Sequence, residues 1–413
     1  MYLMGNHKRT DPLRGRQIID MKTSPFEKRI KRRIIGREHQ FFVVCSPGLK
    51  KICQNEMLEL GFSKDSLKEI PGGIEFKSKL ETCLMLNLHL GSPSRILMRI
   101  SHFKADSFKK LEKKINAIDW ILYLPENCSL KFNVTTKKSR LYHSDAIEQR
   151  CEKIIQDQLN MGSAFTSSSK NQSNQTIYIR ADNDEFTISL YSTGDLLFKR
   201  SIKQKVYKAP LRENLAFAML FWAGYSKKDI LIDPMCGSGT FSLEAAMMKS
   251  NIPSGFFRSF ALESWPGFSQ KAYAHMKKQA QKKFLTFAEK QIFASDIDDM
   301  ALTAMEQNIS NPHFKPIINL GQKDFFSINP SKISHGKKGV VMLNPPYGKR
   351  LGEKSDTRSF YREIGKKLST DFKGWRTGII LPSREAKSYL GLRLELKPIF
   401  HGGLDIFAGM GMI

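Results

Sequence analysis

The chain has 413 residues, 41% of them hydrophobic, which is enough for two or three domains with their own cores. The sequence holds no apolar run of about 18 residues and no signal-peptide apolar region, which argues against membrane insertion and secretion and favours the cytoplasm. The formal net charge of +26 predicts a polyanionic partner. Nucleic acid is favoured over an anionic membrane surface because no amphipathic apolar face accompanies the charge. A merely basic soluble protein is the alternative.

The cysteines give no sign of a metal site or a disulfide framework. They lie at positions 45, 53, 83, 128, 151 and 236, without a Cys-x-x-Cys pair or a Cys/His cluster of zinc spacing. We expect reduced core residues, no metal and no obligate protein partner.

The N-terminal segment 1–38 is strongly basic, with eleven Lys or Arg against four acids and the run Lys28-Arg-Ile-Lys-Arg-Arg33. It shows little apolar periodicity, so we predict a disordered arm that adds nonspecific phosphate contacts. A solvated tail or a wrongly chosen start codon is the alternative.

An α+β layer is predicted from Phe41 onward. A strand at 41–45 precedes Pro47-Gly48 and a helix at 49–60, and strands at 72–76 and 95–103 enclose a helix at 79–90. This order is typical of a ferredoxin-like layer. Helices at 107–117 and 144–159, a polar loop at 161–175 and strands at 131–136, 176–181 and 185–191 complete the N-terminal half.

The C-terminal half alternates strands with helices, which predicts a doubly wound sheet. Residues 195–208 link it to the N-terminal layers, and a helix at 212–222 precedes the first strand at 230–232. Further strands are expected at 291–296, 317–320, 340–343 and 375–381, with a closing hairpin of 394–400 and 404–407. The long connection 251–290 is expected to cover the site.

The first of these strands runs into the loop Asp233-Pro-Met-Cys-Gly-Ser-Gly-Thr240. Pro234 cannot continue a central ladder, so Asp233 lies at the strand's carboxyl end, where ligands bind in open α/β sheets. Gly237 and Gly239 supply positive φ angles or close backbone approach, and Thr240 opens a helix. A helix packed closely on a strand explains such a loop equally well. The lack of Gly-Lys-Ser/Thr disfavours a nucleoside triphosphate.

A second strand end, Val340-Val-Met-Leu-Asn-Pro-Pro-Tyr-Gly348, faces the same crevice. Together with Asp233-Pro-x-x-Gly-Ser-Gly-Thr240, the segment Asn344-Pro-Pro-Tyr347 resembles class I S-adenosylmethionine-dependent methyltransferases that modify exocyclic amino groups. Ala209-Pro-Leu-Arg-Glu-Asn-Leu215 and Ser295-Asp-Ile-Asp298 extend the likeness. From about Phe41 to its end, the chain resembles the THUMP-containing guanine-N2 methyltransferases of large-subunit ribosomal RNA, in a form with a single methyltransferase domain.

The resemblance implies an α/β fold with a Rossmann-like class I methyltransferase sheet at 194–413. A ferredoxin-like part at 39–81 and a THUMP RNA-binding domain at 82–193 would precede it. The segment 131–144 resembles the THUMP core, which makes four of its residues candidate contacts to RNA phosphates: Lys137, Lys138, Arg140 and His143. A solvated, charged strand end is the alternative for each.

Acids just past the strand ends are the candidate ligands of S-adenosylmethionine. Asp296 is placed to accept both ribose hydroxyls, Asp324 to accept from the adenine amino group, and Asp233 to lie near the ammonium group. Asp298 is the alternative to Asp296, although it also suits a helix N-cap. The remaining candidates are the loop residues Cys236, Gly237, Ser238, Gly239 and Thr240.

The candidate catalytic segment is Asn344, Pro345, Pro346 and Tyr347. An exocyclic amine is a poor nucleophile because its lone pair is delocalised into the ring. We therefore expect the Asn344 side-chain oxygen and the Pro345 carbonyl to accept both amine hydrogens. Tyr347 offers a ring on which the extruded base can stack. A structural turn is the alternative.

The leading prediction is an RNA methyltransferase that forms N2-methylguanosine in 23S rRNA. The alternatives are a tRNA guanine-N2 methyltransferase of the same layout, a protein-glutamine or DNA-adenine amino methyltransferase, and a non-enzymatic ribosome-assembly RNA binder. The THUMP-like segment argues against protein and DNA as substrates. A mere binder leaves the intact cofactor loop unexplained.

Overall fold

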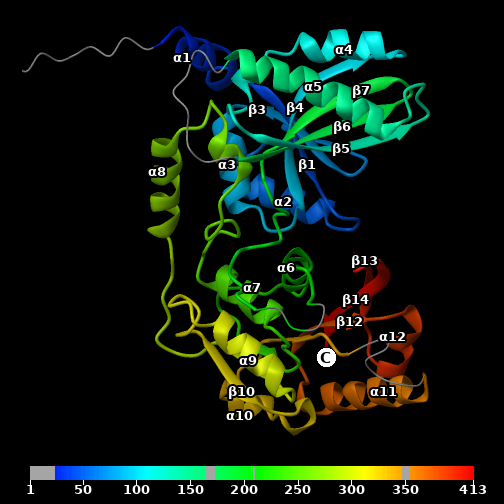
Figure 1. Ribbon diagram of the computed structural model, residues 1–413. Helices are drawn as coiled ribbons and strands as arrows, with labels where there is room; N and C mark the ends of the chain where they lie inside the picture. The colour runs from blue at the N-terminus through cyan, green and yellow to red at the C-terminus, as the bar shows by residue number, and fades with distance from the viewer. Residues whose placement is uncertain (1–23, 163–172, 206, 208–209, 347–353) are drawn as a thin grey trace, which may run out of the picture.

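The computed structural model describes residues 24–162, 173–205, 207, 210–346 and 354–413. Two α/β bodies lie one above the other, each built on a seven-stranded sheet, and helix α8 (Gln270–Gln281) lies beside the N-terminal body (Figure 1). All six cysteines are free and five are buried, as predicted, while Cys128 is partly exposed. Within the described ranges, no helix has the length and apolar character needed to cross a membrane.

The N-terminal sheet has the strand order β2-β3-β1-β4-β7-β6-β5. The long strand β4 pairs with β1 on one side and β7 on the other, so a single sheet spans the predicted ferredoxin-like and THUMP parts. The strands are β1 (His39–Val44), β2 (Lys68–Ile70), β3 (Gly73–Ser78), β4 (Arg95–Lys104), β5 (Ser129–Lys137), β6 (Asn174–Asp182) and β7 (Glu185–Tyr191). The helices are α2 (Lys50–Glu59), α3 (Leu80–His89), α4 (Phe108–Asn116) and α5 (Ser144–Gly162).

Residues 24–38 correct the prediction that 1–38 is a disordered arm. Ser24 caps helix α1 (Pro25–Ile30), and a π-helical segment, Lys31–Ile35, follows. Ile30 and Ile34 are buried in the N-terminal core. Two isoleucines four residues apart on one helical face are enough to anchor a segment whose other residues are mostly charged. The remaining part of the predicted arm, 1–23, lies outside the described residues.

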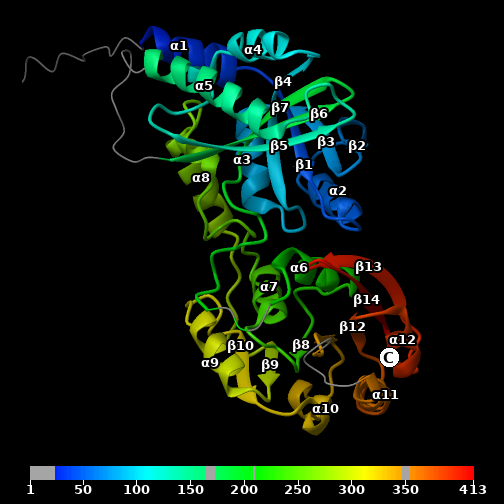
Figure 2. The same ribbon diagram turned by 45° about the vertical axis from the view of Figure 1, so that its right-hand side comes forward.

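The C-terminal sheet has the order β10-β9-β8-β11-β12-β14-β13. Its first five strands are parallel and the last two form an antiparallel hairpin, which confirms the predicted Rossmann-like sheet. One face packs against α6, α7 and α9, and the other against α11 and α12 (Figure 2). The strands are β8 (Leu231–Asp233), β9 (Ile292–Asp296), β10 (Ile318–Gln322), β11 (Val340–Leu343), β12 (Arg376–Leu381), β13 (Glu395–His401) and β14 (Leu404–Met412). The helices are α6 (Glu213–Trp222), α7 (Thr240–Lys249), α9 (Asp299–Asn308), α10 (Pro330–Ser334), α11 (Lys354–Asp371) and α12 (Arg384–Leu390).

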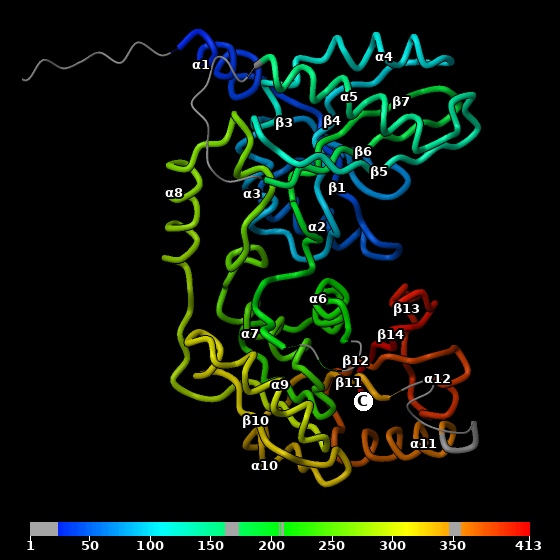
Figure 3. Tube along the Cα trace, viewed as in Figure 1, coloured from blue at the N-terminus to red at the C-terminus, as the bar shows by residue number. Residues whose placement is uncertain are grey.

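The connecting chain passes between the two bodies (Figure 3). Two buried arginines, Arg200 and Arg258, form hydrogen bonds there. Arg200, which is 1% exposed, pairs with Glu244 of α7 at 3.0 Å and donates to the Gly91 carbonyl of the N-terminal body at 2.6 Å. Arg258 donates to four linker carbonyls between Thr193 and Lys199, at 2.6–3.1 Å. These charge-assisted bonds couple the orientation of the N-terminal body to the catalytic sheet.

Candidate active site

The predicted site residues gather at the carboxyl ends of the parallel strands. Strands β8 and β11 are hydrogen-bonded neighbours, so the loops that follow them lie side by side. A cavity of about 670 Å³ opens there. The predicted residues that line it are Cys236, Gly237, Ser238, Thr240, Asp296, Asp298, Asp324, Asn344 and Pro346.

The other predicted residues are buried next to the lining residues or lie outside the described chain. Asp233, Gly239 and Pro345 are buried beside the lining residues. Gly239 has a φ of +85°, which L side chains rarely adopt, and a Cβ there would lie 1.9 Å from the Met305 sulfur, so another residue would strain the loop and displace the Met305 side chain. Tyr347 lies outside the described residues.

Strand β9 anchors the glycine loop. The Cys236 N–H donates to the Ser295 carbonyl at 3.0 Å, and the Gly237 N–H donates to Asp296 Oδ2 at 2.8 Å. Asp296 Oδ1 accepts from the Asp298 N–H at 3.1 Å. A carboxylate oxygen has a second acceptor position, so both oxygens of Asp296 retain capacity for a ligand.

Asp298 has structural partners on both oxygens. Its Oδ1 accepts from the Met300 N–H at 3.0 Å, which makes it the N-cap of α9, and its Oδ2 accepts from the Tyr207 hydroxyl at 2.6 Å. The N-cap interpretation of Asp298 is therefore confirmed. Tyr207 belongs to the connection between the two bodies and also lines the cavity, a position that its sequence context did not predict.

Apolar side chains also line the cavity, and our sequence analysis missed them. Ile297 is 69% exposed, and Phe326 and Phe360 are partly buried. The sequence carried two signals: Ile297 stands between two candidate ligands, and Phe326 comes two residues after Asp324. An exposed isoleucine in a cavity that three acids also line fits a ligand that combines polar groups with a flat apolar ring.

Three buried polar atoms around the cavity have no hydrogen-bond partner within the described ranges: Asp233 Oδ1, Ser238 Oγ and Asn344 Oδ1. Buried polar atoms are normally paired, so unpaired ones beside a cavity fit a bound polar ligand. Burial raises the pKa of Asp233 to about 7, against hydrogen bonds from the Ser242 hydroxyl (2.7 Å) and N–H (3.2 Å) that lower it. A nearby cation would favour the ionised carboxylate.

The cavity suits a nucleoside that carries hydroxyl, amino and cationic groups. Acids and apolar side chains line it together, and the three unpaired atoms belong to the end of β8, the glycine loop and the end of β11. These residues therefore fit S-adenosylmethionine. In the part of the chain that the structure covers, His, Cys, Asp and Glu form no group of three or more that could hold a metal ion.

The predicted RNA contacts lie apart from this cavity, in the N-terminal body. Lys137 ends β5, and Lys138, Arg140 and His143 are exposed in the connection to α5. The Arg140 side chain lies 4.0 Å from Asp106 and 3.9 Å from Asp184, so it is only loosely paired. The Tyr142 ring is 64% exposed and lies beside the His143 ring, with centroids 4.1 Å apart. Tyr142 was not among the predicted contacts.

The parallel sheet with an acid after each of three neighbouring strands defines a class I methyltransferase. Residues 200–399 match the family model described as an RMKL-like methyltransferase domain, and residues 40–97 match the RlmL ferredoxin-like domain. The chain belongs to this methyltransferase family. It is 30% identical over 367 residues to the putative RNA methyltransferase slr0064 of Synechocystis sp., covering 88% of this chain and 94% of that protein.

Two further comparisons extend the family assignment. The ribosomal RNA large subunit methyltransferase K/L of Methylococcus capsulatus is 29% identical over 88% of this chain, and the chain spans about half (50%) of that relative. The crystal structure of SMU.472, a putative methyltransferase complexed with SAH, is 26% identical with a TM-score of 0.80, covering 91% of this chain and 98% of that one. The predictions of fold, family and S-adenosylmethionine-dependent chemistry are confirmed.

Proposed function

We propose that this chain is an S-adenosylmethionine-dependent RNA methyltransferase that forms N2-methylguanosine in 23S rRNA. The observation that carries the proposal is the unpaired, buried Asn344 Oδ1 at the end of β11, in the cavity that Asp296 and Asp324 also line. Relatives named as methyltransferases of large-subunit ribosomal RNA support the substrate class. The proposal places the protein in the cytoplasm with its RNA.

Within this proposal the cofactor ligands have separate roles. Asp296 accepts the ribose hydroxyls, because it ends β9 and holds the glycine loop at the cavity, whereas Asp298 is the N-cap of α9 and accepts from the Tyr207 hydroxyl. Asp324, which caps a short 3-10 helix through the Phe326 N–H, accepts from the adenine amino group, while Ile297 and Phe326 pack on the adenine faces. Asp233 provides negative potential for the ammonium group from behind the loop. S-adenosylmethionine supplies an electrophilic methyl group when bound.

The target amine is prepared by acceptors at the end of β11. Asn344 Oδ1 and the Pro345 carbonyl accept the two amine hydrogens, which favours the pyramidal nitrogen that develops in the transition state. Pro346 lines the cavity beside them and restricts the backbone. Tyr347, outside the described residues, remains the proposed stacking partner of the base.

The N-terminal body supplies the proposed RNA-binding surface. Lys137, Lys138, Arg140 and His143 contact phosphates, and the exposed Tyr142 ring stacks on an unpaired base. The coupling through Arg200 and Arg258 sets the distance between this surface and the site of methyl transfer. A net charge of +26 on the full chain supports a polyanion rather than a protein as substrate.

The test is to incubate the full chain with methyl-labelled S-adenosylmethionine and separate pools of protein-free rRNA and tRNA. Nucleoside mass spectrometry should find label in N2-methylguanosine from 23S rRNA. Label in tRNA alone would favour the tRNA enzyme of the same layout. Label in N6-methyladenosine would overturn the guanine assignment, and no label in any RNA would overturn the RNA substrate.

A further inference from the structure

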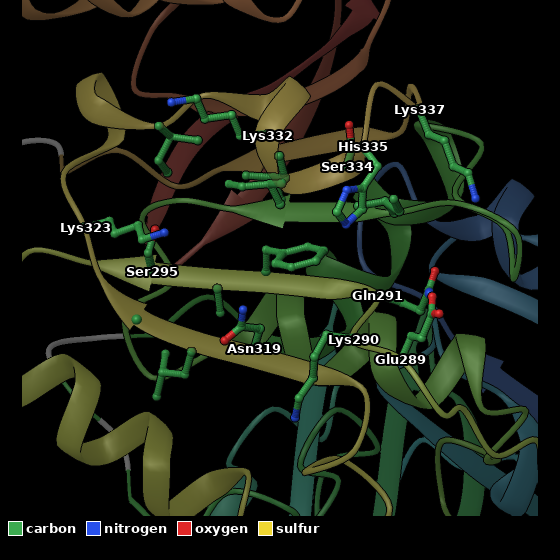
Figure 4. A pocket seen from close by; sticks show the side chains of 18 of the residues that line it. Glu289, Lys290, Gln291, Ser295, Asn319, Lys323, Lys332, Ser334, His335 and Lys337 are labelled. Carbon is green, nitrogen blue, oxygen red and sulfur yellow. The ribbon is translucent and has the colours of Figure 1, made fainter.

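A second hollow of about 800 Å³ crosses strands β8, β9 and β10 on the side of the sheet that carries α10 (Figure 4). We call it the α10 groove. It is open because α10, in the connection from β10 to β11, has only five residues and covers about 7.5 Å of the sheet. Residues of the strands beneath it stay accessible: Asn319 is exposed and Phe293 is partly exposed.

The lining of the α10 groove combines the ring of Phe293 with polar side chains and with aliphatic ones such as Ile230 and Ile333. Ile292 and Ala294 pack into the core on the α7 side, so Phe293, which lies between them in β9, faces the groove. Gln291 and Ser295 lie on the same face of β9, and in β10 Asn319 is paired with Phe293 and Gly321 with Ser295. A partly exposed ring suits a stacked nucleobase.

The rim of the α10 groove is basic. Lys228, Lys323, Lys332 and Lys337 are exposed, and none forms an ion pair with a described acid, while Glu289 is the acid among the described lining residues. Lys290 is different, because its ammonium group donates to the Lys315 and Ile318 carbonyls at 2.5 and 2.9 Å. In Figure 4, Lys323 and Lys332 lie toward the end marked by Ser295, and Lys337 lies toward the opposite end. Unpaired lysines at both ends suit successive phosphates.

One end of the α10 groove meets the cofactor cavity. Ser295 and Lys323 line the groove, while the residues that follow them, Asp296 and Asp324, line the cavity. A single-stranded RNA segment bound along the groove would therefore reach the edge of the cofactor cavity. We propose that the α10 groove binds a single-stranded segment of the RNA substrate, with one base stacked on Phe293 and phosphates at Lys332 and Lys337. This inference rests on the proposed RNA substrate.

The test compares two variants of the full chain that change the net charge equally. Lys332→Glu with Lys337→Glu alters the rim without touching the cofactor cavity. Lys366→Glu with Lys373→Glu, two exposed lysines on α11 and just after it, is the matched control. Fluorescence anisotropy with protein-free 23S rRNA fragments should show binding about tenfold weaker for the groove variant than for the control, with a salt slope smaller by about two. Affinity for S-adenosylhomocysteine should be the same in both.

Ultraviolet crosslinking of the wild type to the same RNA, followed by mass spectrometry, should find a nucleotide on the peptide that contains Phe293. Phe293→Leu, which keeps an apolar side chain, should lose this crosslink while the protein stays folded. Equal RNA affinities of the groove and control variants, or no crosslink at Phe293, would overturn the inference. If the groove variant instead lost binding to acidic polypeptide and kept RNA binding, the partner would be a protein and the inference would be wrong. Wild-type methyl transfer to RNA is measured separately, so failure of the groove is distinguished from failure of the proposed function.

Discussion

Replacement of Asp296 by alanine should weaken cofactor binding more than any other single change at the strand ends. Its two oxygens already accept the Gly237 and Asp298 N–H groups, at 2.8 and 3.1 Å, and each has one acceptor position left for a ribose hydroxyl. A hydrogen bond to a charged group contributes about 1.5–3 kcal/mol. Loss of two such bonds, together with looser anchoring of the glycine loop, predicts about 3 kcal/mol or more, which is about 100-fold in Kd.

Isothermal titration calorimetry with S-adenosylhomocysteine measures this loss directly, and Asp298→Ala is the matched comparison. Asp298→Ala removes a helix N-cap, so it should cost about 1 kcal/mol of stability with a smaller loss of affinity. Thermal unfolding establishes that both variants are folded. If Asp296→Ala binds within about fivefold of wild type while Asp298→Ala loses about 100-fold, the ribose role belongs to Asp298 and the reasoning is wrong.

Four further changes test the rest of the structure. Asn344→Ala should abolish methyl transfer and leave cofactor affinity within about twofold; substantial turnover would remove the amine-accepting role. Glu244→Gln leaves Arg200 buried beside an uncharged partner, which should cost about 3–5 kcal/mol of stability and lower the unfolding temperature by about 10 °C. An unchanged unfolding temperature would contradict the coupling role of Arg200. The Asp233 carboxyl stays protonated up to about pH 7 in the folded state but only up to about pH 4 in the unfolded chain, so the free energy of unfolding should fall as the pH rises between these values. Asp233→Asn should flatten this part of the plot of stability against pH. An unaltered slope would exclude Asp233 as the source of the pH dependence. Removal of 1–23 should reduce the salt dependence of RNA binding without changing the unfolding temperature. Removal of 1–38 should lower the unfolding temperature, because Ile30 and Ile34 are then lost from the core. Equal unfolding temperatures for the two truncated proteins would contradict the anchoring role of 24–38.

The sequence by itself determined the chemistry of the strand ends. Pro234 had to end the first strand, so Asp233 had to lie at its carboxyl end. Gly237 and Gly239 were predicted to supply positive φ angles or close backbone approach, and the structure has a positive φ at both. The alternation of strands and helices determined a parallel sheet, and in such a sheet every acid that follows a strand lies at one edge. These inferences depend on backbone sterics and chain direction, which act over a few residues.

Only the tertiary structure decided what surrounds that edge. Ile297, Phe326, Phe360 and Tyr207 come from four separate segments, and their meeting in one cavity depends on how helices and connections pack over the sheet. Tertiary packing also decided the structure of residues 24–38. Their charge predicted disorder, but Ile30 and Ile34 are buried in the N-terminal core. Whether a residue is buried depends on the side chains that pack against it, and these are distant in sequence. Local patterns of charge and apolarity therefore do not reveal which residues are buried.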